Sequence, residues 1–544
     1  MSPEEAELNA AVEAILNSDS PKKLVVAGPG TGKTSLFKRM LKAASGVPDQ
    51  RIVLTFINNL KDDLERDLGD IAKVHTLHSY CLSLLYGKPA LRGSLSRRFR
   101  CCPGLASLIA VDWELIVESK PPPFVGEMRN LAEENHIPFY LSRGEYYDAV
   151  DFDDSVYRVF DGFRAGRAPV DGYELVAIDE YQDFNALEAG IIDHLGEHNR
   201  IVIAGDDDQA LYGQWRDASW DHIRLLKKAG EYKVFELPFC MRCPEVVVDA
   251  VKDVITKARE LGRLEGRIDK PYKHFAPVKG VDSEKYPKIA NVETSVQNKK
   301  TNYMGRYIAQ AIAGIPLDEV EEAVRGCYPS ALVIVARPYR DQIIAYLKSK
   351  GITVETRVES QSKLTRESGL SILKEDGDSN VGWRILLSAD APTFLRDAIK
   401  QTADRTMALA SVIPVGYRES VLADVDAYVP PEELTRVDVE VTPVEVPVVR
   451  VTSFEGAKGL SAQHVFIAGL HNRELPLNPA AVKDIEICKL VVGLTRTRKK
   501  CTILHTRRFA NQPKSPSTFI SWIAPERLDS VNVDKAYWKK LEET

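Results

Sequence analysis

The stretch from Ala27 to Ser35 limits the possible folds of this chain more sharply than any other. It lies between an apolar, strand-like run and a helical pattern, and it reads Ala27, Gly28, Pro29, Gly30, Thr31, Gly32, Lys33, Thr34, Ser35. Glycines let backbone N–H groups close around a polyphosphate at a helix N-terminus. Lys33 can reach the outer phosphates, and the Thr34 hydroxyl suits Mg²⁺. We therefore predict a nucleoside triphosphate site, although Ala27 stands where the motif's first glycine would fall.

Length and composition restrict the class of protein. With 544 residues the chain is too long for one hydrophobic core, so we expect about three or four domains or subdomains. A net charge of −6 argues against nucleic-acid binding by bulk charge but allows a local basic groove. Eight scattered cysteines indicate reduced thiols. Because no apolar stretch approaches the roughly 20 residues of a membrane span and the N-terminus lacks signal-peptide features, we expect a cytoplasmic protein without membrane contact.

Two apolar strands further along the chain end in polar side chains. Residues 175–178 lead into Asp179 and Glu180, and residues 201–204 lead into an Asp-rich turn and Gln209. Carboxylates at strand C-termini belong at the ligand crevice of a parallel sheet. Asp179 is placed to hold Mg²⁺ through water, Glu180 to orient and deprotonate the attacking water, and Gln209 to sense the γ-phosphate.

Two arginines are candidates for the opposite side of this site. Arg242 and Arg496 can stabilise the charge that develops on a transferred phosphoryl group. For a lone arginine, a surface salt bridge is the alternative interpretation. A second α/β pattern follows later in the chain, with strands predicted near residues 331–335, 465–468 and 501–504, and it carries no glycine-rich loop. One nucleotide site with two α/β domains suggests that the second domain closes over a nucleotide held by the first.

An ordered series of short segments gives the chain a resemblance to a known family. The segments are Thr55–Asn58 (like T-F-x-N), Thr76–Ser79 (T-x-H-S), Asp179–Asp183 (D-E-x-Q-D), Gly205–Tyr212 (G-D-x-x-Q-x-I-Y), Leu237–Arg242 (L-x-x-x-Y-R), Ala457–Leu460 (A-K-G-L) and Val492–Thr497 (V-G-x-T-R-A). In this order they resemble the superfamily 1 helicases of the UvrD/Rep/PcrA type. The resemblance implies an α/β fold, a P-loop NTPase with two RecA-like parallel-sheet domains and two mainly helical insertions.

The same resemblance divides the chain. It implies a first RecA-like, ATP-binding domain from residues 1–80 and 166–238 and a helical insertion at 81–165. The second RecA-like domain would take residues 239–359 and 441–530, with a reduced helical insertion at 360–440. Residues 531–544 are expected to form a C-terminal tail. The insertions look smaller than those of the large family members, in which they grip duplex and regulate unwinding.

Family roles carry over by position. The implied ATPase centre, with ATP and Mg²⁺ as cofactors, comprises Lys33, Thr34, Asp179, Glu180, Gln209, Arg242, Gly459 and Arg496. Single-stranded DNA would be contacted by Phe56, Asn58, His78, Tyr212 and Trp215, and aromatic stacking contributes roughly 1–3 kcal/mol per base whatever the sequence. A core position for Phe56 and a plain buried or surface role for His78 are the alternatives.

Three departures from the family pattern fall on the nucleoside side of the site. No glutamine precedes Gln50, Met241 stands where an aromatic ring usually stacks on the base, and Ser461 replaces an acidic residue that would touch the ribose. The residues for hydrolysis are complete, so we expect hydrolysis with shallow discrimination among bases. One extra residue between Tyr212 and Trp215 also alters the aromatic register of the DNA site.

We interpret the chain as a DNA-dependent ATPase that translocates on single-stranded DNA and unwinds duplex, with 3′→5′ polarity implied by the resemblance. The alternative is an ATP-dependent DNA sensor or regulatory subunit that gates a partner nuclease, for example in phage defence. Small insertions and the acidic net charge favour that alternative, whereas the complete hydrolytic set favours the motor. A P-loop kinase does not explain the segments that follow the phosphate loop.

Overall fold

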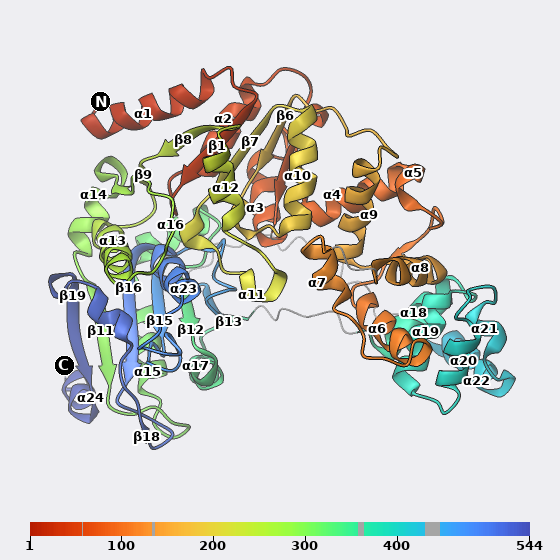
Figure 1. Cartoon of the computed structure of the whole chain (residues 1–544). Coiled ribbons are helices and arrows are strands. Elements are labelled where there is room, and N and C mark those ends of the chain that lie inside the picture. Colours follow the sequence, from red (N-terminus) through yellow and green to blue (C-terminus); the bar gives the residue numbers. More distant parts are fainter. Residues whose placement is uncertain (57, 133–135, 357–363, 430–446, 544) are drawn as a thin grey trace.

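Two large parallel sheets dominate the computed structural model, which describes residues 1–56, 58–132, 136–356, 364–429 and 447–543 (Figure 1). The first sheet belongs to the N-terminal half of the chain and the second to the C-terminal half. Among the described residues, none of the helices is both long and apolar enough to cross a membrane.

The first sheet has six strands, and every adjacent pair is parallel. In spatial order they are β3 (Lys73–Thr76), β2 (Arg51–Thr55), β6 (Leu175–Ile178), β7 (Ile201–Gly205), β1 (Lys22–Ala27) and β8 (Lys233–Leu237). The central strands are runs of Val, Ile, Leu and Ala that are buried on both faces, as a parallel sheet covered by helices requires. Their carboxyl ends share one edge, which brings the phosphate loop, Glu180 and Asp206 together.

Helices cover both faces of this sheet because successive strand residues point to opposite sides. Val25 and Val53 pack with one set of helices and Leu24 and Ile52 with the other. The first set is α1 (Pro3–Leu16), α2 (Lys33–Ala43) and α3 (Asn58–Leu68). The second is α4 (Leu77–Gly87), α9 (Phe152–Arg164), α10 (Ala186–His198) and α12 (Asp221–Ala229).

The second sheet has seven strands, again all parallel. Their order is β13 (Val354–Glu355), β14 (Val449–Thr452), β12 (Ala331–Val335), β15 (Ala462–Ala468), β16 (Thr497–Thr506), β11 (Ile289–Thr294) and β19 (Leu528–Val533). One face packs on α13 (Glu245–Glu260) and α23 (Asp484–Thr495), and the other on α15 (Tyr303–Ala313), α16 (Leu317–Arg325), α17 (Arg337–Ser349) and α24 (Lys535–Glu542). The predicted fold class, α/β with two parallel-sheet domains, is confirmed.

Short elements complete the description. Two-stranded pairs are β4 (Arg100–Cys101) with β5 (Ala149–Val150), β9 (Phe239–Cys240) with β10 (Lys273–His274), and β17 (Arg508–Phe509) with β18 (Gln512–Pro513). Further helices are α11 (Gly213–Arg216) and α14 (Ala276–Lys285), and short 3₁₀ turns are η1 (Pro48–Gln50), η2 (Tyr181–Asp183), η3 (Asp207–Gln209), η4 (Thr518–Trp522) and η5 (Pro525–Arg527).

The C-terminal segment differs from the expectation. Residues 531–544 were predicted as a tail, but β19 crosses that boundary and pairs in parallel with β11. Helix α24 follows, and its Trp538 is buried in the core of the second sheet. The sequence did not indicate this pairing, because β19 is a half-exposed edge strand that lacks a continuous apolar run.

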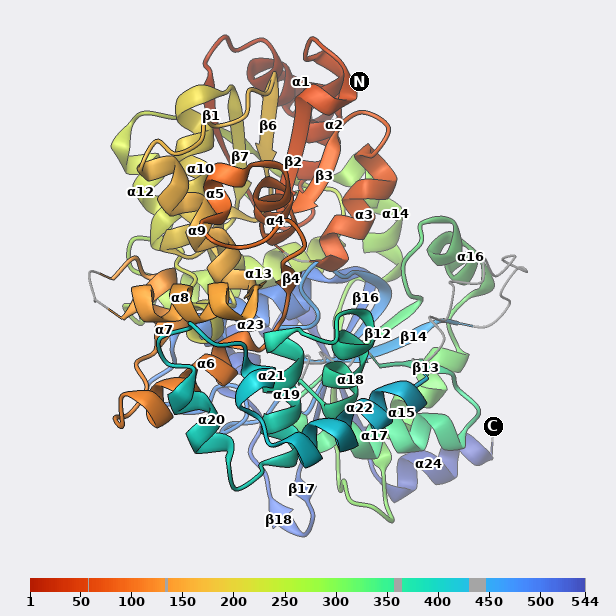
Figure 2. The same ribbon diagram turned by 90° about the vertical axis from the view of Figure 1, so that its right-hand side faces the viewer.

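Helical segments from the two halves of the chain share one core. The first group is α5 (Pro89–Arg92), α6 (Leu105–Ile116), α7 (Phe124–Arg129) and α8 (Ile137–Tyr147), and the second is α18 (Arg366–Glu375), α19 (Asn380–Asp390), α20 (Leu395–Gln401), α21 (Leu409–Val412) and α22 (Val415–Ala427). Helix α6 of the first group lies beside α19 and α20 of the second in both ribbon views (Figures 1 and 2). At their junction the fully buried Asp112 accepts hydrogen bonds from Arg384 at 2.8 Å and from Arg143 at 2.8 Å. The division into domains and insertions stays a prediction.

Candidate active site

The phosphate loop joins β1 to α2, and its glycines are needed for two reasons. Gly30 has φ +75° and Gly32 has φ +90°, a left-handed conformation that favours glycine. A Cβ on Gly30 would lie 2.6 Å from Cβ of Arg242, and one on Gly32 would lie 2.5 Å from Cε of Met241. The loop is therefore packed closely against a segment that follows the first sheet.

Two hydrogen bonds to backbone oxygens of the loop hold it against residues that follow the first sheet. The N–H of Met241 donates to the carbonyl oxygen of Gly30 at 2.9 Å. The hydroxyl of Tyr272 donates to the carbonyl oxygen of Pro29 at 3.1 Å, and its ring covers Gly28. No sequence motif indicated Tyr272, because its contact with the loop is made by residues far apart along the chain.

A cavity of about 290 Å³ opens between the loop and the second half of the chain. It is lined by Pro29, Gly30, Thr31, Gly32, Lys33, Thr34, Ser35, Asp179, Glu180, Gln209, Met241, Arg242, Gly459, Arg496 and Arg498. The structure thus brings together all the residues predicted for catalysis, and the metal pair Thr34 and Asp179. Of the predicted nucleotide-binding residues, Ala27 ends strand β1 and Gly28 lies under Tyr272, so these two do not line the cavity.

Lys33 and Glu180 form an ion pair inside the cavity, with Nζ and Oε1 3.3 Å apart. Burial alone would lower the pKa of Lys33, but the carboxylates of Glu180 and Asp179 outweigh it and raise that pKa. For Glu180 the signs are reversed. Burial alone would raise its pKa, but the positive charges of Lys33 and Lys458 lower that pKa to about 2. The amide of Gln182 donates to Oε2 of Glu180 at 2.5 Å. Glu180 is thus an ionised, oriented carboxylate, as a general base requires.

Asp179 differs from its neighbour. Burial, together with the charge of Glu180, raises the pKa of Asp179 to about 7. A cation at the cavity would keep this carboxylate ionised at neutral pH. Thr34 and Asp179 present oxygen donors to the same cavity, and Mg²⁺ prefers oxygen ligands, so these residues fit the ion.

The opposite wall of the cavity carries arginines. Nη2 of Arg496 donates to Oε1 of Gln209 at 2.8 Å, and its other nitrogens donate to backbone carbonyls. Burial and the neighbouring Arg242 lower the pKa of Arg496 to about 10, which still leaves it protonated at neutral pH. Within the described part of the chain, Arg242, Arg496 and Arg498 have no carboxylate oxygen within 4.0 Å. This wall therefore presents three guanidinium groups without a close ion-pair partner, and Glu180 and Glu322 act on them only from a greater distance.

Lys458, in the A-K-G-L segment, joins the two halves of the chain. Its ammonium lies 2.5 Å from Oδ2 of Asp183 and donates to the backbone oxygen of Gln209 at 2.5 Å. The same ammonium is 5.7 Å from the ring centroid of Tyr212. The motif had pointed to this segment, but its contacts with Asp183 and Tyr212 became visible only in the structure.

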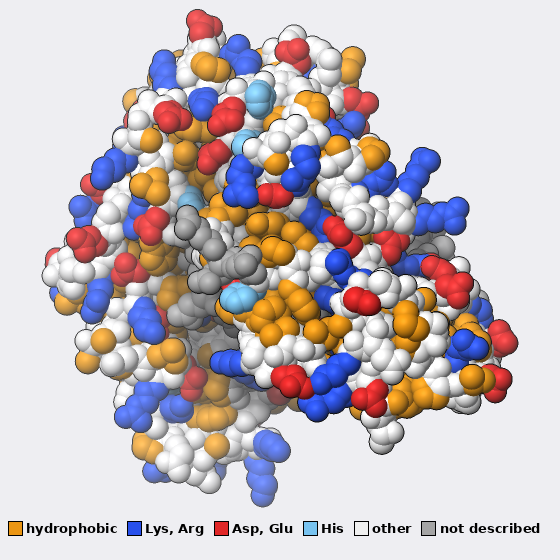
Figure 3. Space-filling model, turned by 45° about the vertical axis from the view of Figure 1, so that its right-hand side comes forward, with side chains coloured by type: hydrophobic (Ala, Val, Ile, Leu, Met, Phe, Trp, Pro, Cys, Tyr) orange, Lys and Arg blue, Asp and Glu red, His pale blue; other side chains and the backbone are white. Residues whose placement is uncertain are grey.

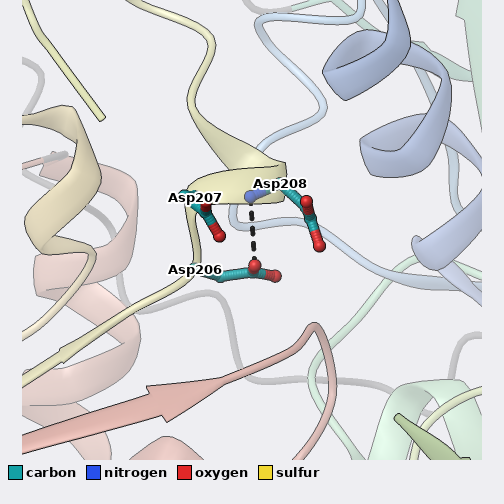
Figure 4. Close-up of side chains that lie close together, drawn as sticks. All are labelled: Asp206, Asp207 and Asp208. Carbon is teal, nitrogen blue, oxygen red and sulfur yellow. Dashed lines mark hydrogen bonds between the residues drawn. The ribbon is translucent and has the colours of Figure 1, made fainter. Parts of the chain in front are cut away.

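An acidic cluster beside the cavity resembles a metal site but is filled by a side chain. The carboxylates of Asp206, Asp207 and Asp208 converge at the end of β7 (Figure 4). The ammonium of Lys270 lies 2.8, 2.9 and 2.8 Å from these three carboxylates in turn. Arg267 adds two contacts of 2.7 Å to Asp208. Because Asp206 also accepts a hydrogen bond of 2.8 Å from the Gln209 amide, the cluster positions Gln209.

The residues predicted to contact DNA lie beyond the nucleotide cavity. The rings of Phe56 and Tyr212 are 5.3 Å apart, and the guanidinium of Arg216 lies 4.4 Å from the Phe56 ring centroid. Phe56 is 7% exposed, so its ring is largely a core ring here. Burial and the nearby Arg216 lower the pKa of His78 to about 3, which leaves it neutral. The side chains of Asn58 and Trp215 lie outside the described residues.

Several known proteins are similar to this chain in sequence or in structure. A family model described as an AAA domain matches residues 9–214. The ATP-dependent DNA helicase PcrA of Bacillus subtilis is 25% identical over 258 residues, which cover 40% of this chain and 34% of that protein. The ATP-dependent DNA helicase UvrD2 of Mycobacterium bovis is 26% identical over 420 residues, 72% of this chain and 57% of that protein. A solved structure of S. cerevisiae Dbp5 bound to RNA and ADP BeF3 aligns with a TM-score of 0.38, at 11% identity, over 98% of this chain and 91% of that one.

The fold and the site define a P-loop protein with two parallel-sheet domains on either side of a nucleotide cavity. The ordered motifs and the matches to PcrA and UvrD2 make the chain similar to the UvrD/PcrA type of superfamily 1 helicases. The match spans about a third of the length of the PcrA relatives.

Proposed function

We propose that this protein is a DNA-dependent ATPase that moves along single-stranded DNA and unwinds duplex with 3′→5′ polarity. One observation carries the proposal: the cationic wall of Arg242, Arg496 and Arg498 faces Lys33 across a cavity built from both halves of the chain. Unneutralised guanidinium groups in a partly buried site are unfavourable unless an anion binds between them. A nucleoside triphosphate supplies that anion.

The ion pair of Lys33 and Glu180 indicates how binding prepares hydrolysis. Phosphate oxygens would compete with Glu180 for the ammonium of Lys33, because both are anions within its reach. Glu180, still held by Gln182, would then be free to accept a proton from the attacking water. Mg²⁺, held by Thr34 and Asp179, would supply positive charge to the phosphates. Arg242 and Arg496 would stabilise the charge that develops on the transferred group.

Coupling to DNA is supported by the contacts of Lys458 and Tyr212. Lys458 lies between Gln209, at the nucleotide cavity, and the ring of Tyr212, beside Phe56. The Tyr212 hydroxyl also donates to the backbone oxygen of Glu455 at 3.3 Å, so Tyr212 contacts both halves of the chain. Closure of the cleft by ATP and its release after hydrolysis would therefore move the surface that holds the bases.

The charged side chains on one face of the molecule are mixed in sign (Figure 3). On the face shown in Figure 3, the described Lys and Arg side chains are interspersed with Asp and Glu side chains. Affinity for single strands would then depend on a short groove and on stacking against Phe56 and Tyr212. For a base to stack on Phe56, Arg216 must move off that ring.

The test measures the ATPase rate with no nucleic acid, single-stranded DNA, duplex DNA and RNA, followed by strand displacement on duplexes with a 3′ or a 5′ tail. We expect stimulation by single-stranded DNA and displacement from the 3′-tailed duplex only. Stimulation without displacement would support the ATP-dependent sensor that gates a partner protein. An ATPase rate indifferent to every nucleic acid would contradict both proposals.

A further inference from the structure

Arg498 is a third arginine of the nucleotide cavity, and no motif pointed to it. It lies near the start of β16, two residues beyond Arg496, and lines the cavity with the phosphate loop. Its guanidinium is held from two sides. Nε donates to Oγ of Ser461 at 2.9 Å, and Cζ lies 3.8 Å from the ring centroid of Tyr328. Such a stacked and hydrogen-bonded guanidinium is pre-organised to bind an anion.

Among the described residues, Arg498 has no carboxylate oxygen within 4.0 Å of its guanidinium, although Glu322 acts on it from further away. Burial and the nearby Arg242 lower the pKa of Arg498, so these surroundings disfavour its charged form. The next residue, Lys499, has two carboxylate partners, Asp282 at 2.9 Å and Glu322 at 2.9 Å. Nearby carboxylates thus neutralise Lys499, whereas Arg498 remains available to a ligand.

Ser461 leaves Arg498 without an ion-pair partner at this position. The family resemblance places an acidic side chain at this position, where it would touch the ribose. Here the Ser461 hydroxyl accepts the hydrogen bond of Arg498 without neutralising it. A carboxylate at position 461 would lie beside the same guanidinium and would form an ion pair with it.

We propose that Arg498 binds a phosphate oxygen of the nucleotide, and that this contact replaces a carboxylate–ribose contact at position 461. The inference rests on the proposed nucleotide site and specifies its ligand class. The ligand is a nucleoside polyphosphate recognised by phosphate charge, with ribose and deoxyribose accepted alike. ATP and dATP should therefore bind with equal affinity.

The experiment measures dissociation constants of ATP and dATP for the wild type, Arg498→Ala, Arg498→Lys and Ser461→Glu. Because hydrogen bonds to charged groups contribute about 1.5–3 kcal/mol, Arg498→Ala should weaken both nucleotides by about 10- to 100-fold. Arg498→Lys should recover part of the loss. Ser461→Glu should weaken both nucleotides, because the new carboxylate neutralises Arg498. Lys500→Ala is the matched control: it removes a charge from the same strand at a different cavity and should change neither constant.

Two outcomes would overturn the proposal: wild-type affinity in Arg498→Ala, or tighter binding of ATP but not dATP in Ser461→Glu. The second would mean that position 461 contacts the ribose. Lys33→Ala separates this failure from failure of the nucleotide site itself. If Lys33→Ala abolishes binding and Arg498→Ala does not, only the Arg498 proposal fails. If the wild type binds neither nucleotide, the proposed function fails as well.

Discussion

Arg496 and Gln209 are joined across the nucleotide cavity by a hydrogen bond of 2.8 Å from Nη2 to Oε1. Gln209 comes from the end of the first sheet and Arg496 from the end of α23, so the bond links the two halves of the chain. The amide nitrogen of Gln209 is engaged by Asp206, which leaves its oxygen directed at Arg496. A γ-phosphate would compete with that oxygen for the guanidinium.

This relationship predicts the effect of Arg496→Ala. Loss of a guanidinium that stabilises transferred charge should lower turnover by about 10³-fold or more, with DNA affinity nearly unchanged. The measurements are single-turnover hydrolysis and single-stranded DNA binding. Arg507→Ala, which removes an exposed arginine paired with Glu293, is the control. Normal hydrolysis with lost DNA binding would move Arg496 from the nucleotide site to the DNA surface.

Lys33→Ala and Glu180→Gln should both abolish turnover, but for different reasons. The lysine change removes a positive charge from the phosphates and should weaken nucleotide binding. The glutamine change removes only the base, so ATP should bind and remain unhydrolysed. Equilibrium binding with rapid-quench hydrolysis separates the two effects. Near wild-type hydrolysis by Glu180→Gln would show that another group accepts the proton.

Lys270→Met tests the acidic cluster. Methionine keeps much of the side-chain length but leaves three buried carboxylates without their shared cation, so the free energy of unfolding should fall by about 3–5 kcal/mol. The measurement is urea unfolding at neutral pH. Lys257→Met is the control, because its exposed pair with Glu260 should contribute no more than about 1 kcal/mol. Equal losses in the two variants would mean that Lys270 does not neutralise the cluster in solution.

The sequence predicted those features that are encoded by residues close together along the chain. Apolar runs predicted the central strands, and the phosphate loop and the D-E pair marked the carboxyl edge of the first sheet, where the structure places them. The cavity collects the catalytic residues that the motifs singled out. Their roles, and the assignment of DNA-contacting residues, stay predictions.

The residues that sequence reasoning missed act through contacts between distant segments. Tyr272 covers the phosphate loop, Lys270 fills the acidic cluster, and Arg498 lines the cavity. Along the sequence each is one more aromatic or basic residue, and nothing nearby distinguishes it from a solvated side chain. The acidic cluster of Asp206, Asp207 and Asp208 is an example. Its sequence indicates that a positive charge binds there, but it does not indicate that this charge is the ammonium of Lys270.

Stability below neutral pH should depend on Glu319, a fully buried carboxylate at the second sheet. It accepts hydrogen bonds from Lys285 at 2.6 Å and from Tyr286 at 2.7 Å, and it lies 2.7 Å from Nε2 of His464. Burial alone would raise the pKa of Glu319, but these partners outweigh it and lower the pKa from 4.5 to about 2. The ionised form is therefore favoured by folding.

Because the folded pKa lies below the unfolded one, this stabilisation is complete above about pH 4.5 and is lost as the pH falls towards 2. At about 1.4 kcal/mol per pKa unit, it amounts to about 3 kcal/mol. Glu319→Gln should lower the free energy of unfolding by about that amount at pH 7, and its difference from the wild type should narrow between pH 4.5 and pH 2. Urea unfolding across this range measures both, with the exposed Glu321→Gln as control. A difference that stays constant with pH would show that Glu319 contributes through packing instead of charge.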